Sequence, residues 1–272
     1  MTTDIAPVQS STGAVGPLAA LRRTEVLGCP IHPISREVLQ DELVRRIRER
    51  RPTTILFANV HKLVLARQDA DLRSALAAAD LVLPDGQPLV WAARWLGTPV
   101  PERLAGADMM HVTLELASQN SWRVFFLGTR PQVLRRAVRR VASRYPGLIM
   151  AGSHHGYFRA EESERVVAAI NASLADVLLV ALGSPHKELW LTRFRSQLNV
   201  PIRQAVGGSF DILAGKRRRA PRWMQRAGLE WLYRMLQDPV HLSGRYFFTN
   251  SIFLLLLVRA LLRRAFGRSG PA

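Results

Sequence analysis

The sequence predicts an α/β fold: a Rossmann-like, mainly parallel sheet with helices on both faces, plus a C-terminal helical appendage that associates with membranes. Three observations predict it. Short apolar runs alternate with longer segments of helical periodicity over residues 26–215. After residue 208 the strand pattern stops, and from about residue 221 only helical patterns remain. The C-terminal residues 216–272 are rich both in Lys/Arg and in apolar residues.

The alternating region predicts six strands and seven helices. Strands are expected where short apolar runs end at turn-forming residues, and helices where apolar residues recur every three or four positions. The expected strands are residues 54–60, 81–84, 123–127, 148–151, 176–182 and 202–206. The expected helices are residues 36–49, 62–79, 87–96, 107–117, 131–145, 160–174 and 188–197. The chain then divides into a flexible leader (1–25), an α/β domain (26–215) and a basic helical appendage with an interfacial helix (216–272).

The composition of the 272 residues is that of a folded protein, with 48% hydrophobic and 22% charged residues. Cys29 is the one cysteine, so no disulfide can form within the chain and nothing requires an oxidising compartment. Residues 1–25 lack the charged and long apolar regions of a signal peptide. We therefore expect a flexible leader rather than a secretory signal.

Positive charge is concentrated toward the C-terminus. Residues 216–272 carry 12 Lys/Arg and 2 Asp/Glu, whereas the first 215 residues carry 26 and 19. Such a surface attracts nucleic acid, anionic lipid headgroups or pyrophosphates. Residues 246–262 are apolar, but their uncharged part ends at Arg259, short of the roughly 20 residues that cross a bilayer. This pattern favours a helix in the membrane interface; the alternative is a helix packed on the core or on a neighbouring subunit.

Polar side chains follow the first two strands, and in such sheets ligands bind at the carboxyl ends of the strands. Asn59 can hold a ligand hydroxyl or amide, although an asparagine here also caps a helix. Asp85 stands where a general base would act, with a simple Asp-Gly turn as the alternative. Arg103 lies in a loop among small residues, where packing does not account for it, and Asp108 is expected in the first turn of the next helix.

Glycines follow the third and the last strands. Gly128 precedes a helix, which makes a plausible phosphate or ribose site. Gly207 and Gly208 offer bare backbone amides to a pyrophosphate, and Lys187 reaches back toward an anion. Neither a GxGxxG nor a GxxxxGK[ST] pattern occurs, which argues against dinucleotide oxidoreductases and P-loop nucleotidases.

Two features look like metal sites but have better explanations. His154 and His155 are adjacent, yet no cysteine or carboxylate stands at ligand spacing from them. The segment 69–71 has the DxD pattern that chelates a divalent ion in many sugar-nucleotide enzymes, but it lies within a helical pattern. There a solvated helix face or a local cap is the expected role. We therefore expect no metal site and no cofactor.

The chain carries six distinctive segments: FANVHKL, AADLVLPDG, PERLAGADM, FFLG, LVALGSPHKELW and AVGGSFDILAGKRRRAPRWMQRAGLEWLYRMLQDP. Taken in order, they resemble the WecG/TagA/CpsF glycosyltransferase family (glycosyltransferase family 26). The resemblance covers roughly residues 26–239. The last segment is the longest and the most specific.

The resemblance implies an inverting, metal-independent glycosyltransferase. Such an enzyme moves a sugar from a UDP-sugar to a polyprenyl-diphosphate-linked saccharide, as a peripheral protein at the cytoplasmic face of the inner (plasma) membrane. By the same resemblance, Asp85 is the base that takes the acceptor proton, and Asn59 and Arg103 occupy active-site positions. The nucleotide-sugar pocket then includes Gly128, Gly183, Pro185, Lys187, Glu188, Gln204, Gly207, Gly208 and Asp211. The appendage resembles the part that covers the site and contacts the lipid diphosphate, which implies binding roles for Arg219, Arg234 and Arg245.

The chain departs from the family pattern in two places. Phe57 stands where many relatives have Thr, and His186-Lys187 stands where many have Lys-Gln. Both departures touch the donor or acceptor pocket. The donor sugar therefore stays open between glucose and N-acetylmannosamine types, for an exopolysaccharide or another cell-surface polysaccharide.

Two other function classes fit parts of the sequence. A nucleic-acid-binding protein would use the basic tail, but Trp223, Trp231 and Tyr233 have a helical spacing better suited to packing. A noncatalytic scaffold at the membrane surface would need no base at Asp85. The expected partners are a UDP-sugar donor, a polyprenyl-diphosphate-linked saccharide acceptor and an anionic membrane surface. A homo-oligomer is a further option, and no nucleic acid is expected.

Overall fold

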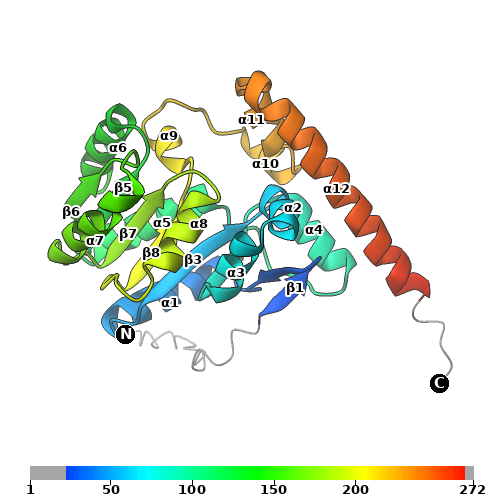
Figure 1. Cartoon of the computed structure of the whole chain (residues 1–272), viewed down its shortest axis with the longest axis horizontal. Helices are drawn as coiled ribbons and strands as arrows, with labels where there is room; N and C mark the ends of the chain where they lie inside the picture. Colours follow the sequence, from blue (N-terminus) through cyan, green and yellow to red (C-terminus); the bar gives the residue numbers. More distant parts are fainter. Residues whose placement is uncertain (1–22, 267–272) are drawn as a thin grey trace, which may run out of the picture.

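The computed structural model describes residues 23–266 and is built around a six-stranded parallel sheet in the order β4-β3-β8-β7-β5-β6 (Figure 1). The strands are β3 (Thr53–Ala58), β4 (Leu81–Pro84), β5 (Arg123–Gly128), β6 (Ile149–His154), β7 (Val177–Ala181) and β8 (Ile202–Ala205). They coincide with the six expected strands, so the predicted parallel α/β sheet is confirmed. Strand β4, which follows β3 in the sequence, lies on one side of β3. Strands β5 to β8 all lie on the other side, with β8 next to β3. Ligands bind in α/β sheets at such a point of divergence.

Helices cover both faces of the sheet, as expected. Side chains alternate along each strand, so Leu56 and Leu127 enter one core cluster while Phe57 and Phe126 enter the other. The first face is covered by α2 (Val60–Gln68), α3 (Ala70–Ala78), α4 (Gln87–Trp95), α7 (Ser163–Ala172) and α8 (His186–Arg193). The second face is covered by α1 (Arg36–Arg48), α5 (Gly106–Gln119), α6 (Pro131–Arg144) and α9 (Ser209–Leu213). A short 3-10 turn, η2 (Ala160–Glu162), precedes α7.

A short hairpin precedes the sheet and was not expected from the sequence. Strands β1 (Thr24–Val26) and β2 (Cys29–Ile31) pair antiparallel. Just after β2, the backbone N–H of His32 donates to Val82 O at 2.8 Å, and the Val82 N–H donates to His32 Nδ1 at 2.9 Å. The segment therefore covers the open edge of β4. Most of the expected leader, residues 1–22, lies outside the described residues.

The helix expected over residues 62–79 is two helices, because the chain breaks between α2 and α3 at Asp69. The Asp69 side chain accepts a hydrogen bond from the Leu72 N–H at 2.9 Å and so caps α3. The local cap expected at the 69–71 segment is present.

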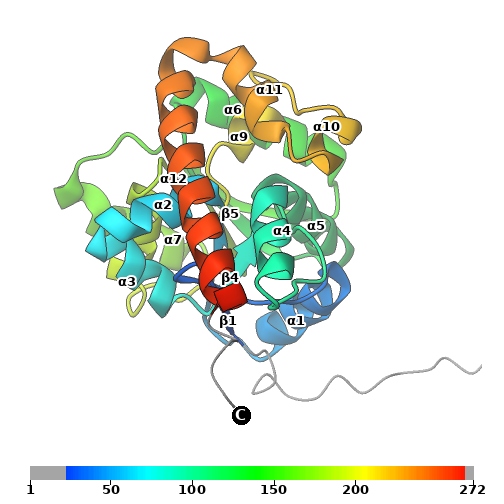
Figure 2. The ribbon, with the colours of Figure 1, turned by 90° about the vertical axis from the view of Figure 1, so that its right-hand side faces the viewer.

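The C-terminal part is helical and consists of α10 (Arg222–Arg226), α11 (Glu230–Gln237) and α12 (Pro239–Phe266). Helix α12 runs back along the α/β part and packs on α2 (Figures 1 and 2). Its Phe253 and Leu257 join the core cluster that α2 shares with the sheet. At its far end, Arg264 donates to the Trp95 carbonyl of α4 at 2.9 Å. The appendage is thus joined to the α/β part along its length.

The outer side of α12 is apolar and exposed. Its large exposed side chains are Val240, Phe247, Phe248, Leu254, Leu255, Val258, Leu262 and Phe266. The helix begins at Pro239, earlier than the apolar run alone indicated, and is 28 residues long with a mean hydropathy of 1.5 in its most apolar window. Within residues 23–266 it is the one helix whose length and composition suffice to cross a bilayer. The same length and composition also fit a helix that lies on a membrane surface.

Candidate active site

A cleft of about 460 Å³ opens at the carboxyl ends of the central strands. Its floor comes from the loops after β3, β4, β7 and β8, which contribute Asn59, Asp85, Gly183 and Gly207. Its roof comes from the appendage, where α11 and α12 contribute the residues Trp231, Arg234, Arg245 and Tyr246. The cleft therefore lies where the sheet topology predicts a ligand, between two parts of the chain that are distant in sequence.

Asp85 follows β4 and faces the cleft with a free carboxylate. Its backbone N–H donates to Ala58 O at 2.7 Å, which fixes the turn against the neighbouring strand. Gly86, with φ at +147°, then turns the chain into α4 in a conformation that side chains disfavour. Within residues 23–266 no hydrogen bond or ion pair engages the half-buried Asp85 carboxylate, so it can accept a proton from a bound molecule.

Asn59 has both of the roles considered for it. It is the N-cap of α2, where its Oδ1 accepts from the Lys62 N–H at 3.1 Å. It also lines the cleft next to Gly86, whose position for a Cβ lies 3.8 Å from the Asn59 Cβ. Because the cap uses the carbonyl side of the amide, the NH₂ side remains to donate to a ligand.

Two lysines and one glutamate are buried at the base of the cleft. Glu188 Oε1 lies 2.7 Å from Lys62 Nζ and 3.0 Å from Lys187 Nζ, and its Oε2 accepts from Ser184 Oγ at 3.1 Å. Burial raises the pKa of Glu188, but the two ammonium groups outweigh it and hold that pKa below its usual range. Burial, and then the charge of Lys62, lowers the pKa of Lys187 to about 8. Lys187 lines the cleft, whereas Glu188 lies beneath it.

The two glycines after β8 differ from the expectation. The Gly207 N–H is not bare, because it donates to Val180 O at 3.2 Å. What Gly207 provides is close approach: its φ is +54°, and a Cβ there would lie 3.5 Å from Lys187 Cε. Among residues 23–266 no backbone carbonyl accepts from the Gly208 N–H, and Gly208 lines the cleft. One amide rather than two is therefore available to a phosphate.

Ion pairs fasten the roof to the floor, and they engage both Arg103 and Arg219. Arg103 lines the cleft, and its guanidinium donates to Glu230 Oε2 at 2.7 Å and to Gln225 Oε1 at 3.0 Å. The Arg219 guanidinium donates to both carboxylate oxygens of Asp108, to Oδ2 at 2.6 Å. We call these four charged residues, Arg103, Asp108, Arg219 and Glu230, the clasp. They bridge chain separations of 111 and 127 residues.

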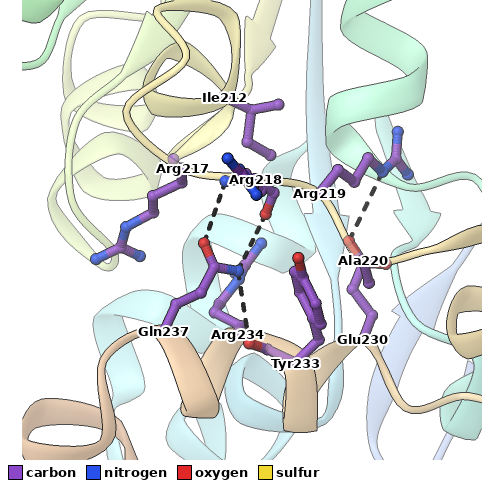
Figure 3. A pocket seen from close by; sticks show the side chains of 10 residues that line it. Ile212, Arg217, Arg218, Arg219, Ala220, Glu230, Tyr233, Arg234 and Gln237 are labelled. Atoms are coloured by element: carbon purple, nitrogen blue, oxygen red, sulfur yellow. Dashed lines mark hydrogen bonds and ion pairs between the residues drawn. The ribbon is translucent and has the colours of Figure 1, made fainter.

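A small pocket of about 40 Å³ adjoins the cleft between α11 and the segment that precedes α10 (Figure 3). Gln237 fixes this segment by accepting from the Arg218 N–H at 3.1 Å and donating to the Arg218 carbonyl at 3.0 Å. Arg217 pairs with Asp238 at 3.2 Å. Arg234 lines both the pocket and the cleft and is exposed. The basic run thus forms one wall of the roof.

Several expected binding residues do not line the cleft. Gln204 is buried beneath it and accepts from Thr113 Oγ1 at 2.7 Å. Gly128 has φ at +122° and packs against β7, where a Cβ would lie 2.5 Å from the Ala181 carbonyl carbon. The Asp211 carbonyl accepts from the Lys216 N–H at 2.9 Å and closes the turn after α9. Pro185 is the N-cap of α8. These residues support the site rather than face it.

His61 was not expected and lines the cleft. Its buried Nδ1 has no hydrogen-bond partner within residues 23–266. Burial, followed by the charges of Arg245 and Lys62, lowers the pKa of His61 to about 4, so the imidazole is neutral. The signal was present in the sequence, since His61 follows Asn59 by two residues in the same strand-end segment. A histidine is also ordinary in the first turn of a helix, so the sequence alone did not mark His61 as a residue of the cleft.

The cleft is strongly cationic. Two carboxylates, Asp85 and Glu230, share its lining with the side chains of Lys62, Arg103, Lys187, Arg217, Arg234 and Arg245. Among residues 23–266 no group of three or more His, Cys, Asp or Glu side chains is arranged to hold a metal ion. The arrangement can hold an anion such as a diphosphate while one carboxylate accepts a proton.

Comparison with known proteins assigns the chain to a family of enzymes. Two relatives are both named N-acetylglucosaminyldiphosphoundecaprenol N-acetyl-beta-D-mannosaminyltransferase. One, from Bacillus spizizenii (strain ATCC 23059 / NRRL B-14472 / W23), is 36% identical over 174 residues, which is 64% of this chain and 67% of the relative. The other, from Bacillus subtilis (strain 168), is 33% identical over the same shares of each chain. Residues 24–267 match the profile of the Glycosyl transferase WecG/TagA/CpsF family. The chain therefore belongs to the WecG/TagA/CpsF family and is a glycosyltransferase.

Proposed function

We propose that this glycosyltransferase moves a hexose from a UDP-sugar to a saccharide linked through a diphosphate to a polyprenyl lipid, with inversion at the anomeric carbon. The names of the two relatives support this acceptor class, because each names a diphosphoundecaprenol-linked sugar. The donor hexose is of the glucose or N-acetylmannosamine type. The product is an intermediate of an exopolysaccharide or another cell-surface polysaccharide.

The observation that carries the proposal is the free carboxylate of Asp85 inside a cationic cleft. An inverting transfer is a single displacement. The acceptor hydroxyl oxygen bonds to the anomeric carbon, the bond from that carbon to UDP breaks on the opposite side, and the hydroxyl proton goes to Asp85. Asn59, which lines the same cleft, donates its NH₂ to the hydroxyls of the bound sugar.

Positive groups of the cleft stabilise the departing UDP, whose diphosphate gains the electron pair of the broken bond. Gly208, Arg217 from the segment that precedes α10 and Arg234 from α11 all line the cleft. Arginine binds diphosphate oxygens through paired donors. We propose that these cations take the part that a divalent ion has in other enzymes of sugar nucleotides.

The acceptor lipid lies in a membrane, and we propose that α12 brings the cleft to it. The exposed Leu254, Leu255 and Leu262 lie on the same helix as Arg259 and Arg263. An apolar face combined with basic residues gives reversible binding to an anionic bilayer surface. We place the protein at the cytoplasmic face of the inner membrane, as a peripheral protein.

The test is transfer by the purified full-length chain to a polyprenyl-diphosphate saccharide, with Asp85→Asn as the variant. We expect the wild type to form a product of inverted anomeric configuration, equally well with and without EDTA. Loss of a general base lowers kcat by about 10²–10⁴-fold, which is the expected effect of D85N. The matched control is Asp41→Asn on the exposed side of α1, with unchanged kcat. An unchanged rate in D85N, or retained configuration, would show that the proposal is wrong.

A further inference from the structure

Two large aromatic side chains are exposed on α4 next to the rim of the cleft. Trp91 and Trp95 stand one helical turn apart and are 37% and 54% exposed, and their rings stack with centroids 6.5 Å apart. Gln87, one turn before Trp91 on the same helix, lines the cleft. The stacked pair therefore forms an apolar stripe that begins at the cleft and leads away from it along α4.

Trp91 also lies against the roof. A Cβ at Gly228, in the turn between α10 and α11, would lie only 2.9 Å from Trp91 Cη2, so the ring packs against the bare backbone of this turn. Gly228 itself lines the cleft. Trp91 thus stands at the edge of the cleft, at the point where α4 meets the roof.

The other end of the stripe reaches α12. Arg264 donates to the Trp95 carbonyl at 2.9 Å, and Figure 2 shows α4 beside the C-terminal half of α12. Two residues to either side of Arg264, the helix exposes Leu262 and Phe266. The stripe therefore connects the cleft with the apolar side of α12, which we propose to touch the membrane.

The proposed acceptor must cross between these two places, because its sugar reaches Asp85 while its polyprenyl chain lies in a membrane. The sugar and the diphosphate are polar and suit the cationic cleft, but the first isoprene units have to leave it over part of its rim. Where Arg234, Arg245 and Asn250 line the cleft, an apolar chain would cover polar groups that prefer water. Beside Trp91 it meets an aromatic face that buries its apolar surface.

We propose that Trp91 and Trp95 bind the isoprene units next to the diphosphate of the acceptor and guide them from the cleft to the membrane. The inference rests on the proposed function and adds to it a lipid-binding site, separate from the bilayer contact of α12. The ligand is a branched apolar chain that packs on the flat indole faces. Its affinity comes from the apolar surface that this contact removes from water.

The test is calorimetric titration of the full-length protein in buffer without vesicles, with UDP at saturation so that the donor's diphosphate site is filled. One probe is farnesyl diphosphate, which has three isoprene units and is kept below the concentration at which it forms micelles. The other is isopentenyl diphosphate, which has one unit. We expect the wild type to bind the longer probe at least about 10-fold more tightly, because only the longer chain covers both rings.

Trp91→Ala/Trp95→Ala is expected to reduce this preference to about two-fold or less, because the apolar contact is lost. Its affinity for isopentenyl diphosphate should stay the same, which also shows that the variant is folded. Trp95→Ala alone keeps the contact of Trp91 with the roof and should lose part of the preference. The matched control is Trp223→Ala. Trp223 is 65% exposed on α10 and lies outside the cleft lining, so this variant should keep the preference.

Equal affinity of the wild type for the two probes would overturn the inference. So would a double variant that keeps the full preference but binds anionic vesicles more weakly, because the tryptophans would then contact the bilayer instead of the acceptor chain. An equal loss in Trp223→Ala would also overturn it, as unspecific binding to exposed indoles. If the double variant no longer binds UDP, and so is unfolded, Trp95→Ala decides in its place. A wild type that binds neither probe would overturn the proposed function, and the inference with it.

Discussion

The floor and the roof of the cleft are built in different ways. The floor consists of strand-end loops whose functional groups are fixed by neighbours in the α/β part: Asp85 by a backbone bond to β3, Lys187 by the buried Glu188. The roof carries Arg234 on the short helix α11 and Arg245 on α12, and both arginines are exposed. Groups that act on reacting atoms need fixed positions, whereas groups that meet a lipid-linked acceptor must let it enter and leave. From this difference we propose that the floor carries out the chemistry and that the roof captures the acceptor.

The roof itself is attached by two kinds of contact. Helix α12 contributes Phe253 and Leu257 to the core. Detaching the helix would expose these apolar side chains to water, which costs free energy. Helices α10 and α11 are held through the half-buried clasp, whose ion pairs stabilise the closed arrangement much less. The clasp is therefore the place where a small change separates the two regions.

Breaking the clasp is expected to give the larger of two effects on this comparison. In Glu230→Gln, Arg103 loses its 2.7 Å carboxylate partner and α11 is held less firmly. We expect kcat/KM for the lipid-linked acceptor to fall about 5- to 30-fold, as for the loss of one charged hydrogen bond. The affinity for UDP, measured by calorimetry, should stay the same. Glu164→Gln on the exposed side of α7 is the matched control. A loss of UDP affinity equal to the loss in acceptor transfer would contradict the separation of roles.

A smaller effect is expected on the titration of His61, which lies on the floor but is influenced by the roof. Burial comes first among the causes of its pKa of about 4, and the charge of Arg245 on α12 comes second. In Arg245→Gln the pKa of His61 should therefore rise toward its usual value, as read from its ring protons by NMR. His32 serves as the internal control. Its pKa, also about 4, is lowered by burial and by Arg23, so the substitution should leave it unchanged. Equal shifts of both histidines would disprove a direct effect of the roof on the floor.

The same two histidines predict how the free energy of unfolding changes with pH. Their folded pKa values, about 4, lie below the ordinary value of 6.5, so the unfolded chain binds more protons between these limits. Their contribution to the free energy of unfolding is complete above pH 6.5 and is lost as the pH falls toward 4.

Much of the floor could be predicted from the sequence, and little of the roof. The six strands are continuous apolar runs, and parallel topology alone brings Asn59, Asp85 and Gly207 to one edge of the sheet. The hairpin β1–β2 has strands of three residues, too short for any periodic signal. The clasp joins residues more than a hundred positions apart, and local patterns contain no information on such pairs. Arg103 was expected at an active-site position and Arg219 in substrate binding, but which carboxylates they meet depends on how the appendage folds back.

Two further features needed the packed structure. Whether the Gly207 N–H is available to a ligand depends on the register between β8 and β7, because the Val180 carbonyl accepts its hydrogen bond. The charge surplus at Lys187 appears only once Lys62, from another helix, is seen to share Glu188. The spacing of residues in the sequence identifies the loops that face the cleft. It does not identify the hydrogen-bond and ion-pair partners of the residues in those loops.

The most direct test of the division between floor and roof compares two acceptors. One is a full-length polyprenyl-diphosphate saccharide in anionic vesicles, and the other carries a short, water-soluble lipid chain. The variant Leu254→Glu/Leu255→Glu places two carboxylates on the exposed face of α12, where the leucines are 61% and 58% exposed. The control Ala168→Glu/Ala169→Glu places the same charge on exposed positions of α7.

We expect the α12 variant to lose at least about 10-fold of its activity on vesicles, because its apolar contact and its attraction to anionic lipid are both weakened. Its activity on the soluble acceptor should equal that of the wild type, and the control should be unaffected on both. If activity on the two acceptors fell together, or if vesicle activity were unchanged, α12 would have no separate role in meeting the membrane-bound acceptor, and the account would be contradicted.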